Sequence, residues 1–327
     1  MEAEYFRLWF CHLSDISSKR GMILSYNIFE NCLFRYRNVN NKNLSALENN
    51  CLYFSTPENF NDPYDNLIYA NLENILSNVL KNLYTGMDDY LEKLKTWNSL
   101  AAYIGYEFWN SSKREEIIHN QFGLIADSVD YIKKSIRKNV KIICFSEVYD
   151  SLLMWSHYAN NHQGFLLAYD IDELKKAKRY STDGMPIDNK IRLEQVKYVS
   201  KQIDLSEEIE DYVRYNMMDT MGDVEERDVN VPQYKLREAI TEKAEDWKYE
   251  KEWRLIPRII DLQKESPLAY IVCSPKAIIL GTHCNKENSE RIVSIAKKVD
   301  IPVYRLFLNE FSPEFKLVIG ATENVII

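Results

Sequence analysis

The sequence has little that would place it in a membrane or on nucleic acid. It contains no apolar run near the roughly 20 residues that a membrane-spanning helix needs. It also contains no long block of Lys or Arg, and its formal net charge is −8, so the overall charge does not indicate nucleic-acid binding. Residues 1–9 begin acidic and lack the basic flank and apolar core of a secretory signal. We therefore expect no membrane partner; the net charge does not indicate nucleic acid, although it leaves room for a local basic cleft, and the sequence does not identify an acceptor macromolecule.

Cysteine is also scarce, with six in 327 residues and no paired spacing between them. This pattern is typical of reduced thiols rather than of a disulfide framework, and it favours a cytoplasmic protein. Apolar residues make up 46% and charged residues 28%, as in ordinary globular proteins. The length allows one large domain with insertions or two tightly joined domains.

The order of the elements predicts a mixed α+β fold. Short apolar or alternating runs predict strands near residues 33, 52, 142, 165, 253, 271, 278 and 304. Apolar residues three and four apart predict a large helical insertion over about 66–139, and 204–228 is an acidic segment expected to be a solvated helix and loop. We predict an N-terminal extension, 1–32, and one domain, 33–327, with a central mixed β-sheet that is either continuous or split.

Two arginines stand out on the first predicted strand, Cys32–Arg37. Because strand side chains alternate, Arg35 and Arg37 share one face, while Phe34 and Tyr36 share the other. Two guanidinium groups on one face indicate an anionic partner.

A polar and aromatic segment follows the strand near residue 142. It predicts a short helix that carries Trp155, His157, Tyr158 and His162 between two strands. Buried aromatic residues with polar tips are common in cores. We favour this packing role for Trp155 and Tyr158, and weigh packing and function equally for the two histidines.

Cys144 offers a different chemistry, because it could act as a nucleophile with His157 or His162 as its base. A cysteine in an apolar strand is usually a packing residue, and nothing in the sequence indicates that it is activated. These three residues also lack a recognised metal-ligand spacing. We therefore predict no metal site.

The loop Thr56–Asp65 is dense in turn-forming residues, which include Asn61, Asp62 and Asp65. Such side chains often hold a loop rigid through hydrogen bonds to the backbone. The spacing is not that of a calcium-binding loop, so we favour this structural role over metal binding.

Residues 249–257 alternate in character, which predicts a strand with Glu250, Glu252 and Arg254 on one face. These charges could form a catalytic or binding site. They could equally form a row of ion pairs with Arg35 and Arg37 on a neighbouring strand.

The chain resembles the bacterial family catalogued as domain of unknown function 2971. The motifs that carry this resemblance are Leu33-Phe-Arg-Tyr-Arg37, Leu52-Tyr-Phe-Ser-Thr-Pro57, Phe60-Asn-Asp-Pro63, Cys144-Phe-Ser146, Leu153-Met-Trp-Ser-His-Tyr-Ala159 with Gly164-Phe165, and Trp247-Lys-Tyr-Glu-Lys-Glu-Trp-Arg254. The family name implies no activity.

The order of the polar groups more loosely resembles the ADP-ribosyltransferase superfamily. There, an Arg or His on a first strand, a Ser or Tyr on a second and a Glu on a late strand surround NAD. This resemblance implies that Arg37 or Arg35 holds the diphosphate or a ribose, as a bidentate guanidinium can. It also implies that Ser55 and Thr56 support the glutamate by hydrogen bonds.

The same resemblance implies that Glu252 or Glu250 is catalytic. The carboxylate would bind the nicotinamide ribose and stabilise the positive charge that develops as nicotinamide leaves. In the Glu-any-Glu arrangement, the first glutamate would activate the acceptor. Trp155, Tyr158 or Tyr36 would stack on the nicotinamide ring.

We therefore expect a cleft that collects Arg35, Arg37, Ser55, His157, Tyr158 and Glu252. The function expected there is that of an NAD-binding ADP-ribosyltransferase or NAD glycohydrolase in bacterial defence or stress. The alternative is a non-catalytic module of a defence system that binds a ligand or a partner.

Overall fold

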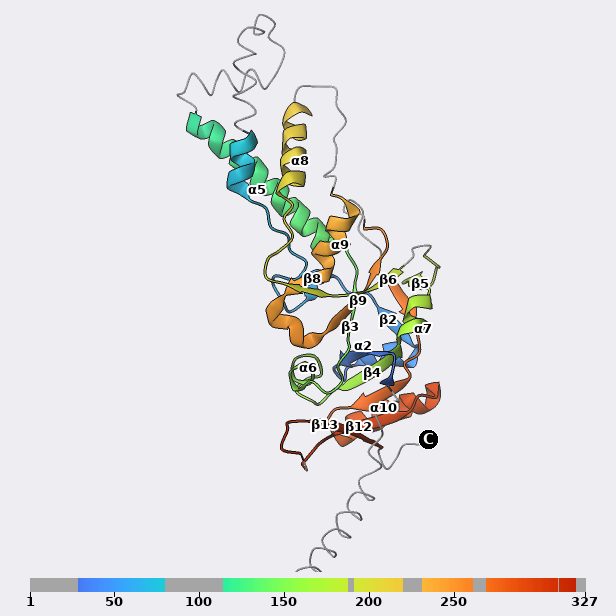
Figure 1. Ribbon diagram of the computed structural model, residues 1–327. Helices are drawn as coiled ribbons and strands as arrows, with labels where there is room; N and C mark the ends of the chain where they lie inside the picture. Colours follow the sequence, from blue (N-terminus) through green and yellow to red (C-terminus); the bar gives the residue numbers. More distant parts are fainter. Residues whose placement is uncertain are drawn as a thin grey trace, which may run out of the picture.

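The computed structural model describes residues 29–79, 114–187, 191–219, 231–260, 269–310 and 312–321. Within them, a large mixed sheet runs through the middle of the molecule (Figure 1). Its strand order is β13-β12-β11-β4-β1-β3-β9-β6, and only β11 and β12 are parallel neighbours. The strands are β1 Cys32–Arg37, β3 Ile143–Ser146, β4 Phe165–Asp170, β6 Ile191–Gln195, β9 Glu252–Pro257, β11 Ala277–Leu280, β12 Val303–Leu308 and β13 Leu317–Ala321. The predicted mixed α+β fold is confirmed.

Two predicted strands belong to a separate sheet. The strands near residues 52 and 271 are β2 (Cys51–Tyr53) and β10 (Ala269–Val272), which pair with each other and with β5 (Arg179–Ser181). A further parallel pair joins β7 (Lys197–Val199) to β8 (Glu242–Ala244). Of the two predicted arrangements, a continuous and a split sheet, the structure therefore has the split one: β2 and β10 leave the large sheet, because apolar runs alone do not reveal which partner a strand pairs with.

The helices are α2 Asn41–Glu48, η2 Pro57–Asn59, α5 Arg114–Asn139, α6 Leu152–Tyr158, α7 Ile171–Lys176, α8 Ser206–Asp219, α9 Gln233–Thr241, η3 Glu245–Glu250 and α10 Lys286–Val299. Asn40, Ser151, Asp170 and Asn285 cap α2, α6, α7 and α10 with their side-chain oxygens, which satisfies backbone donors that lack a partner within the helix. No helix in the described ranges is long and apolar enough to cross a membrane.

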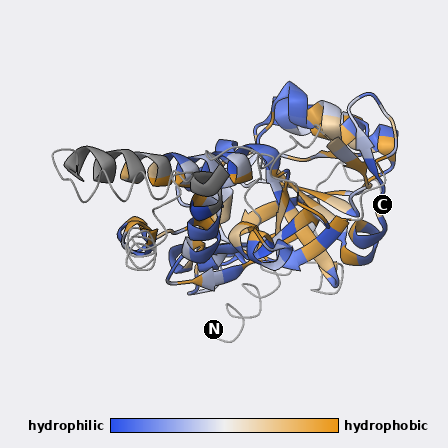
Figure 2. Cartoon of the chain, turned by 90° about the horizontal axis from the view of Figure 1, so that it is seen from above, coloured by the Kyte–Doolittle hydropathy of each residue, from blue (hydrophilic) through white to orange (hydrophobic). Residues whose placement is uncertain are grey.

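Hydrophobic residues cover both faces of the large sheet. On one face they pack against the small sheet, α2 and α10, and on the other against α6. A further cluster joins α5, α8 and α9, which stand together at one end of the molecule (Figure 1). Seen from above, the strands are predominantly coloured as hydrophobic (Figure 2). The sheet therefore provides a rigid support for the residues at its centre.

Two expectations about the helical regions were incomplete. The acidic segment near 204–228 is not simply solvated, because Ile209 and Val213 on α8 and Leu205 just before it are buried, while residues 220–228 lie outside the described residues. Within the predicted insertion, α5 and residues 72–79 are helical, while 80–113 lie outside the described residues. The proposed extension, 1–32, also falls mostly outside them.

The loop after α6 fits tightly against β1. Asn160, Asn161 and His162 all adopt left-handed backbone angles, and Gly164 lies two residues further on. A Cβ atom on Gly164 would lie 2.2 Å from the carbonyl oxygen of Arg37, so only glycine permits this approach. The contact fixes α6 against the end of β1.

Candidate functional site

A cleft opens where two central strands separate. β1 and β3 pair with each other only at Phe34 and Ser146. Elsewhere β1 is paired with β4, and β3 is paired with β9. The backbone of Ser55 bridges to that of Ile142 and closes the far side. The resulting cleft has a volume of about 400 Å³, within the usual range for small-molecule sites. The large sheet is therefore interrupted at its centre.

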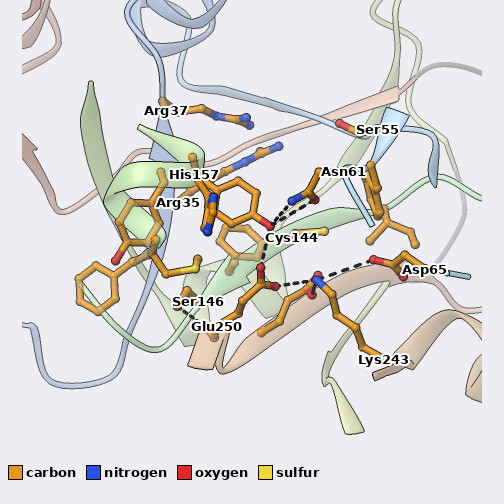
Figure 3. Close-up of a pocket in the computed structure, with 18 of the residues that line it drawn as sticks. Arg35, Arg37, Ser55, Asn61, Asp65, Cys144, Ser146, His157, Lys243 and Glu250 are labelled. Atoms are coloured by element: carbon orange, nitrogen blue, oxygen red, sulfur yellow. Dashed lines mark hydrogen bonds and ion pairs between the residues drawn. The ribbon is translucent and has the colours of Figure 1, made fainter. Parts of the chain in front are cut away.

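Arg35 and Arg37 form one wall of this cleft and extend in the same direction (Figure 3). Arg35 is only 6% exposed. Its Nη2 atom donates to the carbonyl oxygen of Tyr53 across 3.4 Å, its guanidinium lies over the Phe145 ring, and its buried Nη1 atom has no partner. Within the part of the chain that the structure describes, neither arginine forms an ion pair.

The electrostatics of this wall favour an anion. Burial, followed by repulsion from Arg37, lowers the pKa of the Arg35 guanidinium to about 9. Burial also lowers the pKa of Arg37. A buried charge without a counter-charge is unfavourable, so an anionic ligand between the two guanidinium groups would relieve the repulsion.

Glu252 lies in the opposite wall and is held by two cations. Its Oε1 atom accepts from Arg254 Nε at 2.8 Å, and its Oε2 atom accepts from Lys243 Nζ at 3.0 Å and from Arg254 Nη2 at 3.2 Å. Burial raises the pKa of this carboxyl, but Arg254 and Lys243 outweigh burial and hold the pKa at about 2. Glu252 is therefore ionised at neutral pH.

Glu250 connects the same wall to the mouth of the cleft. Its Oε2 atom accepts from Lys243 Nζ at 2.6 Å, and its Oε1 atom accepts from the Tyr158 hydroxyl at 2.6 Å. Asn61 Nδ2 donates to that hydroxyl at 3.1 Å. Burial raises the pKa of Glu250, although Lys243 opposes it. Burial and the Glu250 charge raise the pKa of Tyr158, so this hydroxyl stays protonated and donates.

Asp65 completes the acidic wall. Its Oδ2 atom accepts from Arg254 Nη2 at 2.7 Å and lies 3.8 Å from Lys243 Nζ. The network therefore contains three carboxylates and two cations, and its net charge is −1 when all are ionised. The two walls of one cleft thus carry unbalanced charges of opposite sign.

The ion-pair alternative holds for only one of these walls. Glu250, Glu252 and Arg254 do enter a buried ion-pair network, as that alternative proposed, but Arg35 and Arg37 do not. The strand assignment was also wrong for Glu250. Lys251 adopts a left-handed conformation with φ 43°, so β9 begins at Glu252 and Glu250 ends η3.

Most of the predicted site residues meet at the cleft, and two do not line it. Arg35, Arg37, Ser55, His157, Tyr158, Glu250 and Glu252 all line it. Thr56 instead accepts a hydrogen bond from Lys141 at 3.4 Å. Trp155 is fully buried, and its indole N–H donates to the carbonyl of Tyr149 at 2.7 Å. The packing role favoured for Trp155 agrees with this position.

Three residues of the site lay outside the sequence-based expectation for the cleft. The apolar spacing of residues 233–247 predicts a helix that would include Lys243, but α9 ends at Thr241 and β8 follows. Asp65 and Asn61 were interpreted as turn formers. Asp65 stands next to Asn66 and close to Asp62, so composition alone gave no sign that it reaches Arg254 across the molecule.

The structure gives little support to the cysteine alternative. Burial, and then the negative charge of Glu252, raise the pKa of Cys144 well above its usual range, so the reactive thiolate is disfavoured. The ring of His162 stacks beside Trp155 and is not among the residues that line the cleft. No metal-binding group of three or more His, Cys, Asp or Glu is present among the described residues.

Fold and site together define an α+β protein with a central cleft whose two walls are oppositely charged. Residues 154–255, about a third of the chain, match the model of a family described as "Protein of unknown function (DUF2971)". The match covers α6 from Met154 onward and the whole acidic wall except Asp65, whereas the two arginines precede it. No curated protein and no solved structure matches the chain.

Proposed function

We propose that the protein binds NAD in this cleft and cleaves the bond between nicotinamide and ribose. The observation that carries the proposal is the buried Arg35 beside the half-buried Arg37, neither with a carboxylate partner among the described residues, opposite an acidic wall of net charge −1. NAD has the complementary charges, because its diphosphate is anionic and its nicotinamide ring is cationic.

The arginine wall supports binding of the diphosphate. A guanidinium group offers several N–H donors in a fixed plane and can bind phosphate oxygens in pairs. Arg35 has a buried Nη1 atom that lacks a partner, and Arg37 extends beside it (Figure 3). A diphosphate would satisfy these donors and neutralise both charges.

The acidic wall supports the chemical step. As the bond between ribose C1′ and the nicotinamide nitrogen breaks, its electron pair moves to the ring, and positive charge develops on the ribose. A wall of fixed negative charge stabilises that charge. Water or another acceptor then attacks C1′ with its oxygen, and Glu250 takes the proton that this oxygen releases. The products are nicotinamide and free or transferred ADP-ribose.

Binding is tested by calorimetry with NAD⁺, NADH and inorganic pyrophosphate. We expect NAD⁺ to bind more tightly than NADH, which lacks the ring cation, and pyrophosphate to compete with both. Arg35→Gln should abolish binding, whereas Arg258→Gln, at an exposed position after β9, should leave it unchanged. Equal affinity of NAD⁺ and NADH would contradict the proposed role of the acidic wall.

Catalysis is tested by nicotinamide release from the wild type and from Glu252→Gln. Loss of release with retained NAD⁺ binding supports the enzyme.

One observation favours a second candidate, a non-catalytic ligand-binding module: both Glu252 oxygens already accept hydrogen bonds from protein donors. Binding of NAD⁺ without any release by the wild type would support that module.

A further inference from the structure

Lys243 occupies an unusual position for a lysine. It lies on β8, outside the large sheet, and is 5% exposed. Its Nζ atom lies 2.6 Å from Glu250, 3.0 Å from Glu252 and 3.8 Å from Asp65. Three carboxylates thus converge on one ammonium group at the base of the cleft (Figure 3).

The lysine side chain is restrained on its remaining side. The ring of Trp247 lies 4.9 Å from the ammonium nitrogen, at a distance typical of a cation–π contact. Burial alone would lower the pKa of Lys243, but the charges of Glu252 and Glu250 raise it above its usual value. The ammonium group is therefore charged throughout the neutral range.

We propose that Lys243 is the positioning residue of the site: its ammonium holds Glu250 and Glu252 side by side, both ionised, and so sets the charge of the acidic wall. This inference rests on the proposed function, because there the charged wall selects the cationic nicotinamide ring. Lys243 acts through the two glutamates and does not itself take part in the reaction.

The reasoning follows from the behaviour of neighbouring buried carboxyl groups. Two such groups that share a site do not both stay ionised without a compensating cation, and one of them takes up a proton. Arg254 reaches Glu252 and Asp65, but Lys243 is the cation that contacts Glu250 within the described residues. Glu250 is therefore the carboxyl that Lys243 keeps charged.

Other groups also influence Glu250. Several titratable or charged side chains surround Glu250 and the residues that it contacts. They are Tyr158 on α6, Cys144 on β3, Tyr198 on β7, Glu252 and Arg254 on β9, Asp65 after η2, and Tyr249 on η3 itself. Burial raises the pKa of Glu250. The charge and hydrogen bond of Lys243 lower this pKa, and so does the hydrogen bond from Tyr158.

The test begins without a ligand. Carboxyl groups of ¹³C-labelled glutamate are titrated by NMR in the wild type, Lys243→Met and Lys243→Arg, with Glu250→Gln used for assignment. Removal of the ammonium should raise the pKa of Glu250 by about one to three units, whereas Lys243→Arg should restore most of the wild-type value. An unchanged Glu250 titration in Lys243→Met would overturn the proposal.

The second readout is the ratio of NAD⁺ to NADH affinity. In Lys243→Met, a protonated Glu250 leaves the wall with a net charge of −1, so the ratio should match the wild type at neutral pH and rise above it as the pH rises through the new pKa of Glu250, where the net charge reaches −2. If the ratio does not change across this pH range while only thermal stability drops, Lys243 is a structural residue and the proposal is wrong. Failure of the wild type to bind NAD⁺, with Glu250 still shifted, would instead refute the proposed function alone.

A charge-balanced double variant covers the case in which Lys243→Met does not fold. Lys243→Met with Glu250→Gln leaves Asp65, Glu252 and Arg254, so the net charge remains −1. We expect this variant to fold and to keep the preference for NAD⁺ over NADH. That preference should no longer change with pH. If it folds but the preference for NAD⁺ disappears, the charge of the wall is not what Lys243 controls, and the proposal fails.

Discussion

Arg35 and Arg254 are both buried arginines, and the same substitution should change stability in opposite directions. Arg254 is fully buried and bonded to Glu252 and Asp65. Arg35 is almost as deeply buried but has no carboxylate partner within the described ranges. We predict that Arg35→Met stabilises the ligand-free protein and that Arg254→Met destabilises it.

The magnitude follows from the pKa of Arg35. Burial and Arg37 lower this pKa from the ordinary 12.5 of a guanidinium to about 9, and each unit corresponds to about 1.4 kcal/mol. The charged form is therefore disfavoured by about 5 kcal/mol at most. Because the substitution also removes the contacts with Tyr53 and Phe145, we expect a net gain of about 1 to 2 kcal/mol.

The assay is thermal and urea-induced unfolding without ligand. Arg35→Met should raise the melting temperature by about 2 to 4 °C while abolishing the binding of NAD⁺. Arg254→Met leaves two buried carboxylates without their shared partner, so it should lower stability by about 3 to 5 kcal/mol. If both substitutions destabilise the protein to the same extent, Arg35 is not an uncompensated charge and the anion-binding argument fails.

Three further predictions concern the surroundings of the cleft. Because the pKa of Glu252 is about 2 against an ordinary 4.5, this group contributes about 3 kcal/mol of stability above pH 4.5 that is lost as the pH falls through 2. Glu252→Gln should therefore make the acid loss of stability shallower, as urea unfolding across this range would show. Trp155→Phe should lower stability by about 2 kcal/mol but leave the calorimetric affinity for NAD⁺ unchanged, since the indole lies outside the cleft lining. Gly164→Ala should weaken pyrophosphate binding, because a Cβ atom would displace the backbone at Arg37; unchanged affinity would show that this contact does not position the arginine.

Local patterns predicted the parts of the site that lie on regular strands. In β1, six residues alternate, and the alternation placed Arg35 and Arg37 on one face. The same rule placed Glu252 and Arg254 together, and their side chains do meet at 2.8 Å. Alternation works here because a strand that pairs on both sides has no freedom to rotate its side chains to the other face.

The remaining parts depend on contacts between distant segments. The apolar spacing of α9 continues past its end, so Lys243 looked helical until the pairing of β8 with β7 decided otherwise. The left-handed turn at Lys251 is rare for a residue other than Gly or Asn, and it alone moved Glu250 off the strand. Asp65 and Arg254 are 189 positions apart, and no local rule connects them.

The separation of β1 from β3 also bears on how the protein avoids unwanted association. Unpaired strand edges at the rim of a sheet readily recruit strands from other molecules, and this recruitment leads to aggregation. Here the ladder ends after Phe34 and Ser146 in the middle of the sheet. The Ser55–Ile142 bridge lies on one side of the gap, and the whole opening measures about 400 Å³. Such a space admits a small molecule but excludes a β-strand of another chain, so the protein can present polar groups at an interrupted sheet without inviting self-assembly there.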